Sequence, residues 1–200
     1  MAVETDASVT GISANVISNG SDPLIGTVAS PSSGTTSVSI DRIGKFFTLT
    51  FTLTLARISV TDGAGSGSHG ALKLFDFAQG GLSFLGCRQN YTAYAEGAAL
   101  TTGAGDAVFE IGVGTTAIAA AADGTLAAAN DNVGADIDQT LSGGTTTGTG
   151  FTAAASAFDG TATAADLYLN WSGTAATIDA NSTIDVTGTI TVVGALLGDD

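Results

Sequence analysis

Few residues of this chain are of types that commonly act in catalysis, and they lie far apart in the sequence. His69 is the only histidine and lies in a Gly/Ser segment without an acidic neighbour, whereas a dyad or triad needs a base that titrates near neutrality and a partner to orient it. Cys87 is the only cysteine, so no intrachain disulfide forms, and a lone cysteine is more often a small buried hydrophobe than a nucleophile. We therefore predict that the chain is not an enzyme. Glycoside hydrolysis needs only two suitably separated carboxylates, so a carbohydrate-active enzyme stays the catalytic alternative.

The closest group of acidic residues is Asp131, Asp136 and Asp138. Hard cations take several oxygen ligands from carboxylates, amides and carbonyls, which makes these three the candidate ligands for Ca²⁺. Their spacing matches no EF-hand, and Asp and Asn beside glycine usually bond their own backbone in turns. We predict no metal and no cofactor, and keep the three aspartates as the candidate positions.

The charge of the chain argues against two classes of partner. Nineteen acidic and five basic residues give a net charge of −14, whereas binding to phosphate backbones requires clustered Lys and Arg. We predict no nucleic-acid partner and no membrane partner. No apolar run approaches the length of a membrane span, and the first residues lack the basic and apolar regions of a signal peptide, which indicates synthesis in a cytoplasm.

The composition and the hydrophobic periodicity favour an all-β fold. The chain has 28 glycines and only 12% charged residues, and its periodic segments are built from Thr, Val, Ile and Phe, which suit half-buried strands. In residues 47–55 every second residue is large and apolar and Thr separates them, which predicts a strand with one face in a core. The length of this run predicts a bend or bulge near residues 56–57.

The remaining segments predict further strands joined by glycine-rich loops. Residues 72–77 alternate again, and residues 82–86 are expected to return beside them across Gly80 and Gly81. Alanine-rich residues 117–130 favour a short helix or helical turn. Residues 166–171 and 182–193 are expected to form two long strands near the C-terminus.

These segments suggest two units. Residues 1–35, which contain both prolines, are predicted to form an extended N-terminal arm or an edge segment. Residues 36–200 are predicted to form one antiparallel domain, a two-sheet sandwich or jelly roll. The Gly-rich residues 61–70 and 142–150 are predicted to be exposed loops.

Several stretches resemble a group of tailed-phage virion structural proteins. They are residues 39–48, 70–77, 166–171 and 186–192, and the resemblance covers roughly residues 37–195. It implies a capsid decoration (cement) protein, made in the host cytoplasm and located on the capsid surface. It further implies a homotrimer that binds the major capsid protein at junctions between its subunits.

Such a function needs a rigid core and surfaces that reach neighbouring subunits. Edge strands offer unpaired backbone groups, and residues 1–35 and 182–193 are the segments we expect to contact other subunits. The alternative within the same class of proteins is a head-fibre or tail-associated module that recognises a host glycan. It would use the same sandwich to present the Gly/Thr-rich loops.

Overall fold

The prediction of an all-β chain is confirmed. The computed structural model describes residues 26–63, 65, 67–96, 107–121, 124–141, 148–152, 156–158, 164–174 and 180–198. Within these residues, an 11-stranded antiparallel sheet forms, and the only helical element is a short 3-10 turn. The elements are β1 (Thr27–Val28), β2 (Thr35–Ile43), β3 (Phe46–Asp62), β4 (Ser68–Asp76), β5 (Gly81–Glu96), β6 (Ala107–Gly114), η1 (Ala128–Asn130), β7 (Gly134–Leu141), β8 (Gly148–Thr152), β9 (Ser156–Phe158), β10 (Asp166–Gly173) and β11 (Ser182–Gly198).

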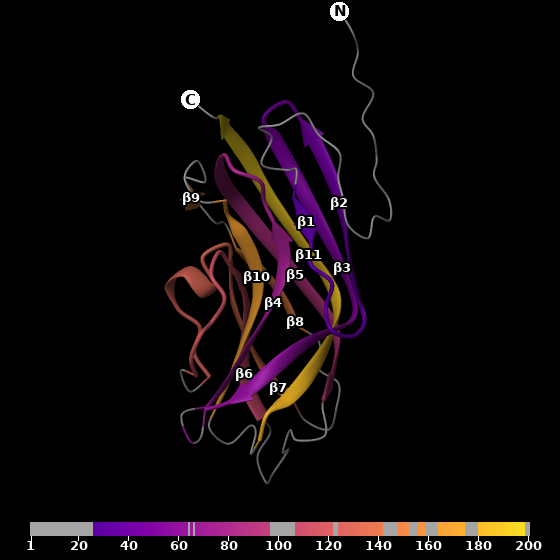
Figure 1. Ribbon diagram of the computed structural model, residues 1–200, viewed down its shortest axis with the longest axis vertical. Coiled ribbons are helices and arrows are strands. Elements are labelled where there is room, and N and C mark those ends of the chain that lie inside the picture. The colour runs from indigo at the N-terminus through magenta and orange to yellow at the C-terminus, as the bar shows by residue number, and fades with distance from the viewer. Residues whose placement is uncertain are drawn as a thin grey trace, which may run out of the picture.

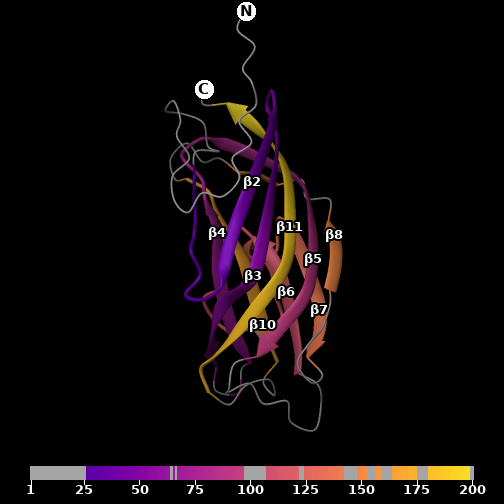
Figure 2. The same cartoon turned by 90° about the vertical axis from the view of Figure 1, so that its right-hand side faces the viewer.

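The sheet curves until its two ends nearly meet. Its strand order is β7-β6-β10-β4-β3-β11-β5-β8, with β1 on β4, β2 on β3 and β9 on β5. The end strands β7 and β8 lie in contact, and Gln89 Nε2 of β5 donates a 2.8 Å hydrogen bond to Ala135 O of β7. The sheet is thus nearly closed and barrel-like (Figure 1). Figure 2 shows β2, β3, β11 and β5 side by side, with β10 and β6 behind them.

The Thr-spaced run of β3 buries one face, as its period predicts. Phe47, Leu49, Phe51 and Leu53 are at most 2% exposed, and the threonines between them point away from the core. The phase then changes by one residue, because the next buried positions are Ala56, Ile58 and Val60. Without that change, these three apolar side chains would face solvent.

A β-bulge produces the change of phase, close to the predicted bend. On β11, Val186 pairs with Ala56 and Gly188 pairs with Leu53, so Thr54 and Leu55 together face the single residue Thr187. Leu55 has a φ of 49° and a half-exposed side chain, and its N–H donates to Thr187 Oγ1 at 3.1 Å. At the bulge, the backbone N–H of Leu55 is therefore bonded by a side chain of the neighbouring strand.

The enclosed face is filled by aromatic and branched side chains. Phe75 packs edge-on against Phe51 and Phe77, with ring centroids 6.3 and 4.7 Å apart, and the Phe77 ring lies 5.9 Å from that of Phe84. Phe109 lies 5.5 Å from the ring of Trp171. Cys87 also lies here at 1% exposure, which confirms the prediction of a buried cysteine, and burial raises the pKa of its thiol to about 12.

Two predictions about pairing are wrong. Residues 72–76 and 82–86 do fall in β4 and β5, and Phe77 lies just beyond β4. However, β4 pairs with β10, β3 and β1, whereas β5 pairs with β11, β8 and β9. The Gly80–Gly81 link therefore carries the chain from one side of the sheet to the other. β11 pairs along both of its edges, with β3 and β5, so its backbone is not available to another subunit.

Three predicted segments fall partly outside the described residues. Of the predicted arm, residues 1–25 lie outside them, whereas Thr27 and Val28 pair with Asp76 and Phe75 of β4. Of the predicted loop at 142–150, residues 142–147 lie outside, and β8 begins at Gly148. The predicted helical stretch is represented, in its described part, by η1. No helix among the described residues is both long and apolar enough to cross a bilayer.

Candidate functional site

One connection lies directly against the outer face of the sheet, the face away from the core. It comprises residues 115–121 and 124–133, between β6 and β7, and we call it the covering segment (Figure 1). Gly112 and Gly114 occupy alternate positions on the outer face of β6 and leave room for it. A Cβ at Gly114 would clash with the backbone of Ala129 and Asn130, and one at Gly112 would lie 3.1 Å from Leu126. Two glycines at period two thus let the segment touch the backbone of the strand.

Asn170 of β10 fastens this segment to the sheet. Its side chain is fully buried; its Oδ1 accepts the N–H of Ile118 at 2.9 Å, and its Nδ2 donates to Thr116 O at 3.0 Å and to Asn130 O at 2.7 Å. A single amide therefore satisfies backbone groups near both ends of the segment. Burying these polar groups is tolerable only because they are paired.

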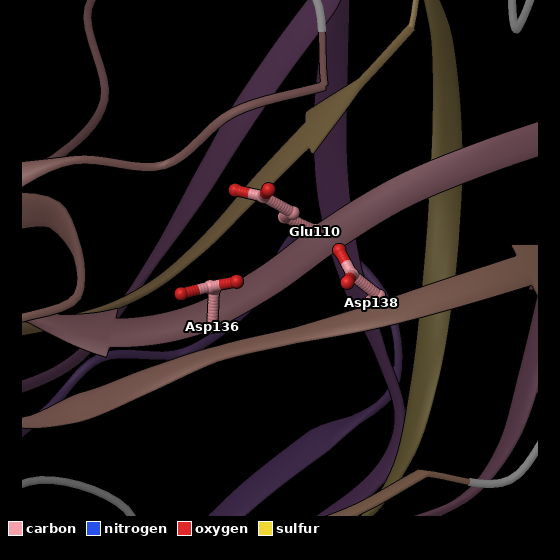
Figure 3. Close-up of side chains that lie close together, drawn as sticks. All are labelled: Glu110, Asp136 and Asp138. Atoms are coloured by element: carbon pink, nitrogen blue, oxygen red, sulfur yellow. The ribbon is translucent and has the colours of Figure 1, made fainter.

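Three carboxylates converge where the covering segment meets β6 and β7. Glu110 pairs with Asp138 across these strands, and Asp136 lies two residues before Asp138 and so on the same face. One oxygen from each of the three lies within 4.8 Å of the others (Figure 3). The Leu126 N–H of the covering segment donates to Glu110 Oε2. Of the sequence-based set of Asp131, Asp136 and Asp138, the structure thus brings the last two together with Glu110, whereas Asp131 is not among the three that converge. We call the four residues the acidic cluster.

Asp131 joins the acidic cluster from the covering segment. Burial, followed by the charge of Asp136, raises the pKa of Asp131. The pKa of Glu110 is raised by burial first and then by the charges of Asp136, Asp138 and Asp131, against the lowering effect of the Leu126 N–H. Of the ion pairs formed within the described residues, none involves the acidic cluster. The repulsion among its carboxylates is therefore not offset by a basic side chain there.

The raised pKa values of Glu110 and Asp131 give the stability of the free chain a testable pH dependence. A carboxyl group whose pKa is raised on folding binds its proton more tightly in the native state, so its contribution is complete below the unfolded-state pKa and is lost as the pH rises through the folded-state pKa. With divalent cations removed, we expect the free energy of unfolding to fall as the pH rises above the ordinary carboxyl pKa of about 4. Urea denaturation across this range measures it.

The same experiment separates the acidic cluster from the other carboxylates. The pKa of Asp166 is lowered; although burial raises it, the hydrogen bonds from Tyr168 and Lys73 outweigh burial, so Asp166 contributes a change of the opposite sign. We expect Glu110→Gln to flatten the fall above pH 4 and Asp166→Asn to leave that fall in place. An equal slope in Glu110→Gln and the unmodified chain would contradict the assignment.

A row of polar residues extends from the acidic cluster across the outer face. Asp138 is opposite Glu110, Glu110 is opposite Ser172 of β10, and Ser172 is opposite His69 of β4. Ser172 is fully buried, and neither its Oγ nor His69 Nδ1 has a hydrogen-bond partner within the described part of the chain. His69, which the sequence places in a flexible loop, is therefore a strand residue beside a serine. That the chain lacks catalysis remains a prediction.

A second surface lies at the end of the sheet where β2 and β3 turn. Ile43 and Phe46 face each other across this hairpin, and Phe46 also pairs with Ala195 of β11. With Val193 and Leu197 on either side of Ala195, and Leu85 on the adjoining β5, five large apolar side chains are 38–82% exposed. We call Ile43, Phe46, Leu85, Val193 and Leu197 the hairpin patch. Figure 2 shows the β2–β3 hairpin beside the C-terminal end of β11.

Basic residues lie around the hairpin patch. Arg42 and Lys45 are exposed at the same hairpin, and Arg88 is exposed on β5. These are three of the five basic residues of the chain; of the other two, Arg57 pairs with Asp185 at 2.7 Å and Lys73 with Asp166 at 3.0 Å. The sequence shows that the basic residues fall in the first half of the chain, but only the pairing of β3 with β11 reveals the apolar surface beside them.

Comparisons with protein-family models, with curated proteins and with solved structures gave no match to this chain. The functional proposal therefore depends on the residues and the geometry described above.

Proposed function

We propose that this chain is a non-enzymatic structural protein of a tailed-phage virion, a decoration protein that binds the outside of the capsid and stabilises contacts between major capsid subunits. The hairpin patch is the observation that carries the proposal. Phe46 and Ile43 are 59% and 82% exposed, and contiguous exposed apolar surface on a soluble domain commonly marks a protein-binding site. The basic residues beside it suit an apolar partner surface with an acidic rim.

The framework behind the patch supports the same proposal. β3 and β11 each span 17 residues and pair along most of their length, so a load applied at the hairpin is distributed over many backbone hydrogen bonds. We further propose that the two sides of the sheet act as the two layers of a sandwich or jelly roll. In this arrangement, the two layers join at the β3–β4 turn and at the contact of β7 with β8.

The assembly belongs to the same proposal. We propose a homotrimer at each junction between major capsid subunits on the virion surface. Three copies held together present three hairpin patches at once, so the second and third contacts form at high effective concentration. This allows firm attachment by patches that are each small.

Virions of the phage that encodes this sequence test the proposal directly. We expect the chain to be present at a fixed ratio to the major capsid protein, and shells stripped of it to rebind the purified chain. Phe46→Asp combined with Ile43→Asp is expected to abolish rebinding, because two charges would be buried without partners. Co-sedimentation with the shells, with cryo-EM of the rebound particles, measures the effect.

Leu55→Asp is the matched control. Leu55 is also half exposed, but it lies nine residues from Phe46 along β3, about 30 Å for an extended strand. Aspartate also tolerates its positive φ better than leucine does. Rebinding should be unchanged in this variant. If the unmodified chain ignores stripped shells, or the double variant rebinds as well as Leu55→Asp, the proposal is wrong; glycan binding by the isolated chain would instead favour a host-recognition module.

A further inference from the structure

The acidic cluster has the ligand set of a hard cation. Three carboxyl groups meet there, with one oxygen of each within 4.8 Å of the others: Glu110 of β6, and Asp136 and Asp138 of β7. Asp131 of the covering segment lies close enough for its charge to act on Glu110. All of the ligand atoms are oxygens, the type that Ca²⁺ takes in sets of six to eight with waters completing the shell. Carboxylates alone do not make a site, however, because exposed acidic groups often lie together without an ion.

Ser172 supplies an independent observation at the same place. It is fully buried and its Oγ lacks a hydrogen-bond partner within the described residues. Its cross-strand partner is Glu110, so the two side chains are neighbours on the outer face. A buried hydroxyl without a partner costs about 1–3 kcal/mol, and it indicates that a polar group belongs beside Glu110.

The geometry points to a calcium site formed by Glu110, Asp136 and Asp138, with Asp131 beside it and a metal-bound water that reaches Ser172 Oγ. The cation neutralises part of the charge that the described basic side chains leave uncompensated. It also joins the covering segment to β7, because Glu110, which accepts the Leu126 N–H of that segment, is a ligand together with Asp136 and Asp138. Calcium binding therefore holds the covering segment on the sheet, and this inference stands whether or not the chain decorates a capsid.

The ligand types indicate which cation this site would bind. Mg²⁺ demands a near-octahedral shell at short distances and gives up its waters reluctantly, whereas Ca²⁺ accepts irregular sets of carboxylates. A zinc site normally includes Cys or His ligands, and the acidic cluster contains neither. We therefore expect the order of affinity to be Ca²⁺ above Mg²⁺.

Titration of the full-length chain tests the site. After treatment with a chelator, CaCl₂ added at constant ionic strength is expected to raise the midpoint of thermal unfolding in a saturable manner, as ligand linkage requires. Tb³⁺ can replace Ca²⁺ as a luminescent probe. Trp171, the only tryptophan, precedes Ser172 on β10, so excitation of the indole should sensitise Tb³⁺ emission, which excess Ca²⁺ should then quench by displacement.

Two substitutions remove ligands with little change of shape. Glu110→Gln keeps an oxygen that can accept the Leu126 N–H, and Asp136→Asn changes an exposed residue. Each is expected to weaken Ca²⁺ binding by at least about tenfold, because affinity follows the number of charged ligands. Asp41→Asn, an exposed residue of β2, makes the same change of charge elsewhere and should leave the affinity unchanged.

Three outcomes would overturn the inference. The first is no saturable effect of Ca²⁺ up to about 10 mM, above the range of the weakest calcium modules. The second is an equal effect of NaCl at matched ionic strength, which would show simple screening. The third is equal affinity in Glu110→Gln and Asp41→Asn. None of these depends on capsid binding, so the two proposals can fail separately.

Discussion

Replacing Asn170 by aspartate is expected to lower the free energy of unfolding by about 4 kcal/mol. The carboxylate can still accept the N–H of Ile118, but it loses both hydrogen bonds that Nδ2 donates, to Thr116 O and Asn130 O. The carbonyl oxygens of Thr116 and Asn130 would then face a negative charge carried by a side chain at a position with 0% exposure. Asn170→Ala should cost less, because it removes the three bonds without burying a charge.

Asn181→Asp is the matched control for this substitution. Asn181 is exposed and its Oδ1 accepts the N–H of Asp62 at 3.0 Å, an interaction that a carboxylate retains. We expect a change within about 1 kcal/mol for it. Urea denaturation gives the free energies, and hydrogen exchange at Ile118 reports whether the covering segment detaches first. Equal stability of the Asn170 and Asn181 variants would mean that Asn170 does not hold the segment.

The role of Asn170 shows where the sequence ceases to be informative. The alternation of residues 166–171 predicts a strand, and it places Asn170 on the face opposite Leu169 and Trp171. Nothing nearby indicates that this outer position is covered, because the partners of Asn170 come from residues 40 to 54 positions earlier in the chain. A polar residue on the outer face of a strand is normally exposed to solvent. Asn170 is instead buried and holds the covering segment on the sheet.

The fold was predictable wherever a local pattern decides it. The period of two in residues 47–55 is set by the pleat of a single strand, so its buried face and the nearby bulge follow from the sequence. Strand pairing is decided by the whole sheet. Residues 72–77 and 82–86 have a hairpin-like link at Gly80–Gly81, yet β4 pairs with β10 and β5 pairs with β11.

Only part of the acidic cluster was likewise predictable from a local pattern. Asp136 and Asp138 are two residues apart in one strand, so their proximity on one face is a local property. Glu110 enters only because β6 pairs with β7 in the register that sets it opposite Asp138. It lies 21 residues before Asp131, and no spacing rule for calcium loops links such positions. The sequence therefore supplies part of the site, and the register supplies Glu110.

Phe75 and Phe46 are expected to separate stability from docking. Phe75 is fully buried between the rings of Phe51 and Phe77, whereas Phe46 is 59% exposed in the hairpin patch. Phe75→Ala should lower the free energy of unfolding by about 4 kcal/mol, from lost apolar burial and the cavity left behind. Phe46→Ala should lower it by less than about 1 kcal/mol. Urea denaturation followed by Trp171 fluorescence measures both.

The two variants should behave in the opposite order in capsid binding. Phe75 lies on the enclosed face and contacts no partner, so any Phe75→Ala chain that remains folded should bind shells like the unmodified chain. Phe46→Ala should bind more weakly although its fold is intact, because an exposed aromatic ring at a patch centre is the type of residue that carries interface energy. If shell binding instead follows stability in both variants, the hairpin patch is not the docking surface, since a loss of fold alone would then account for every loss of binding.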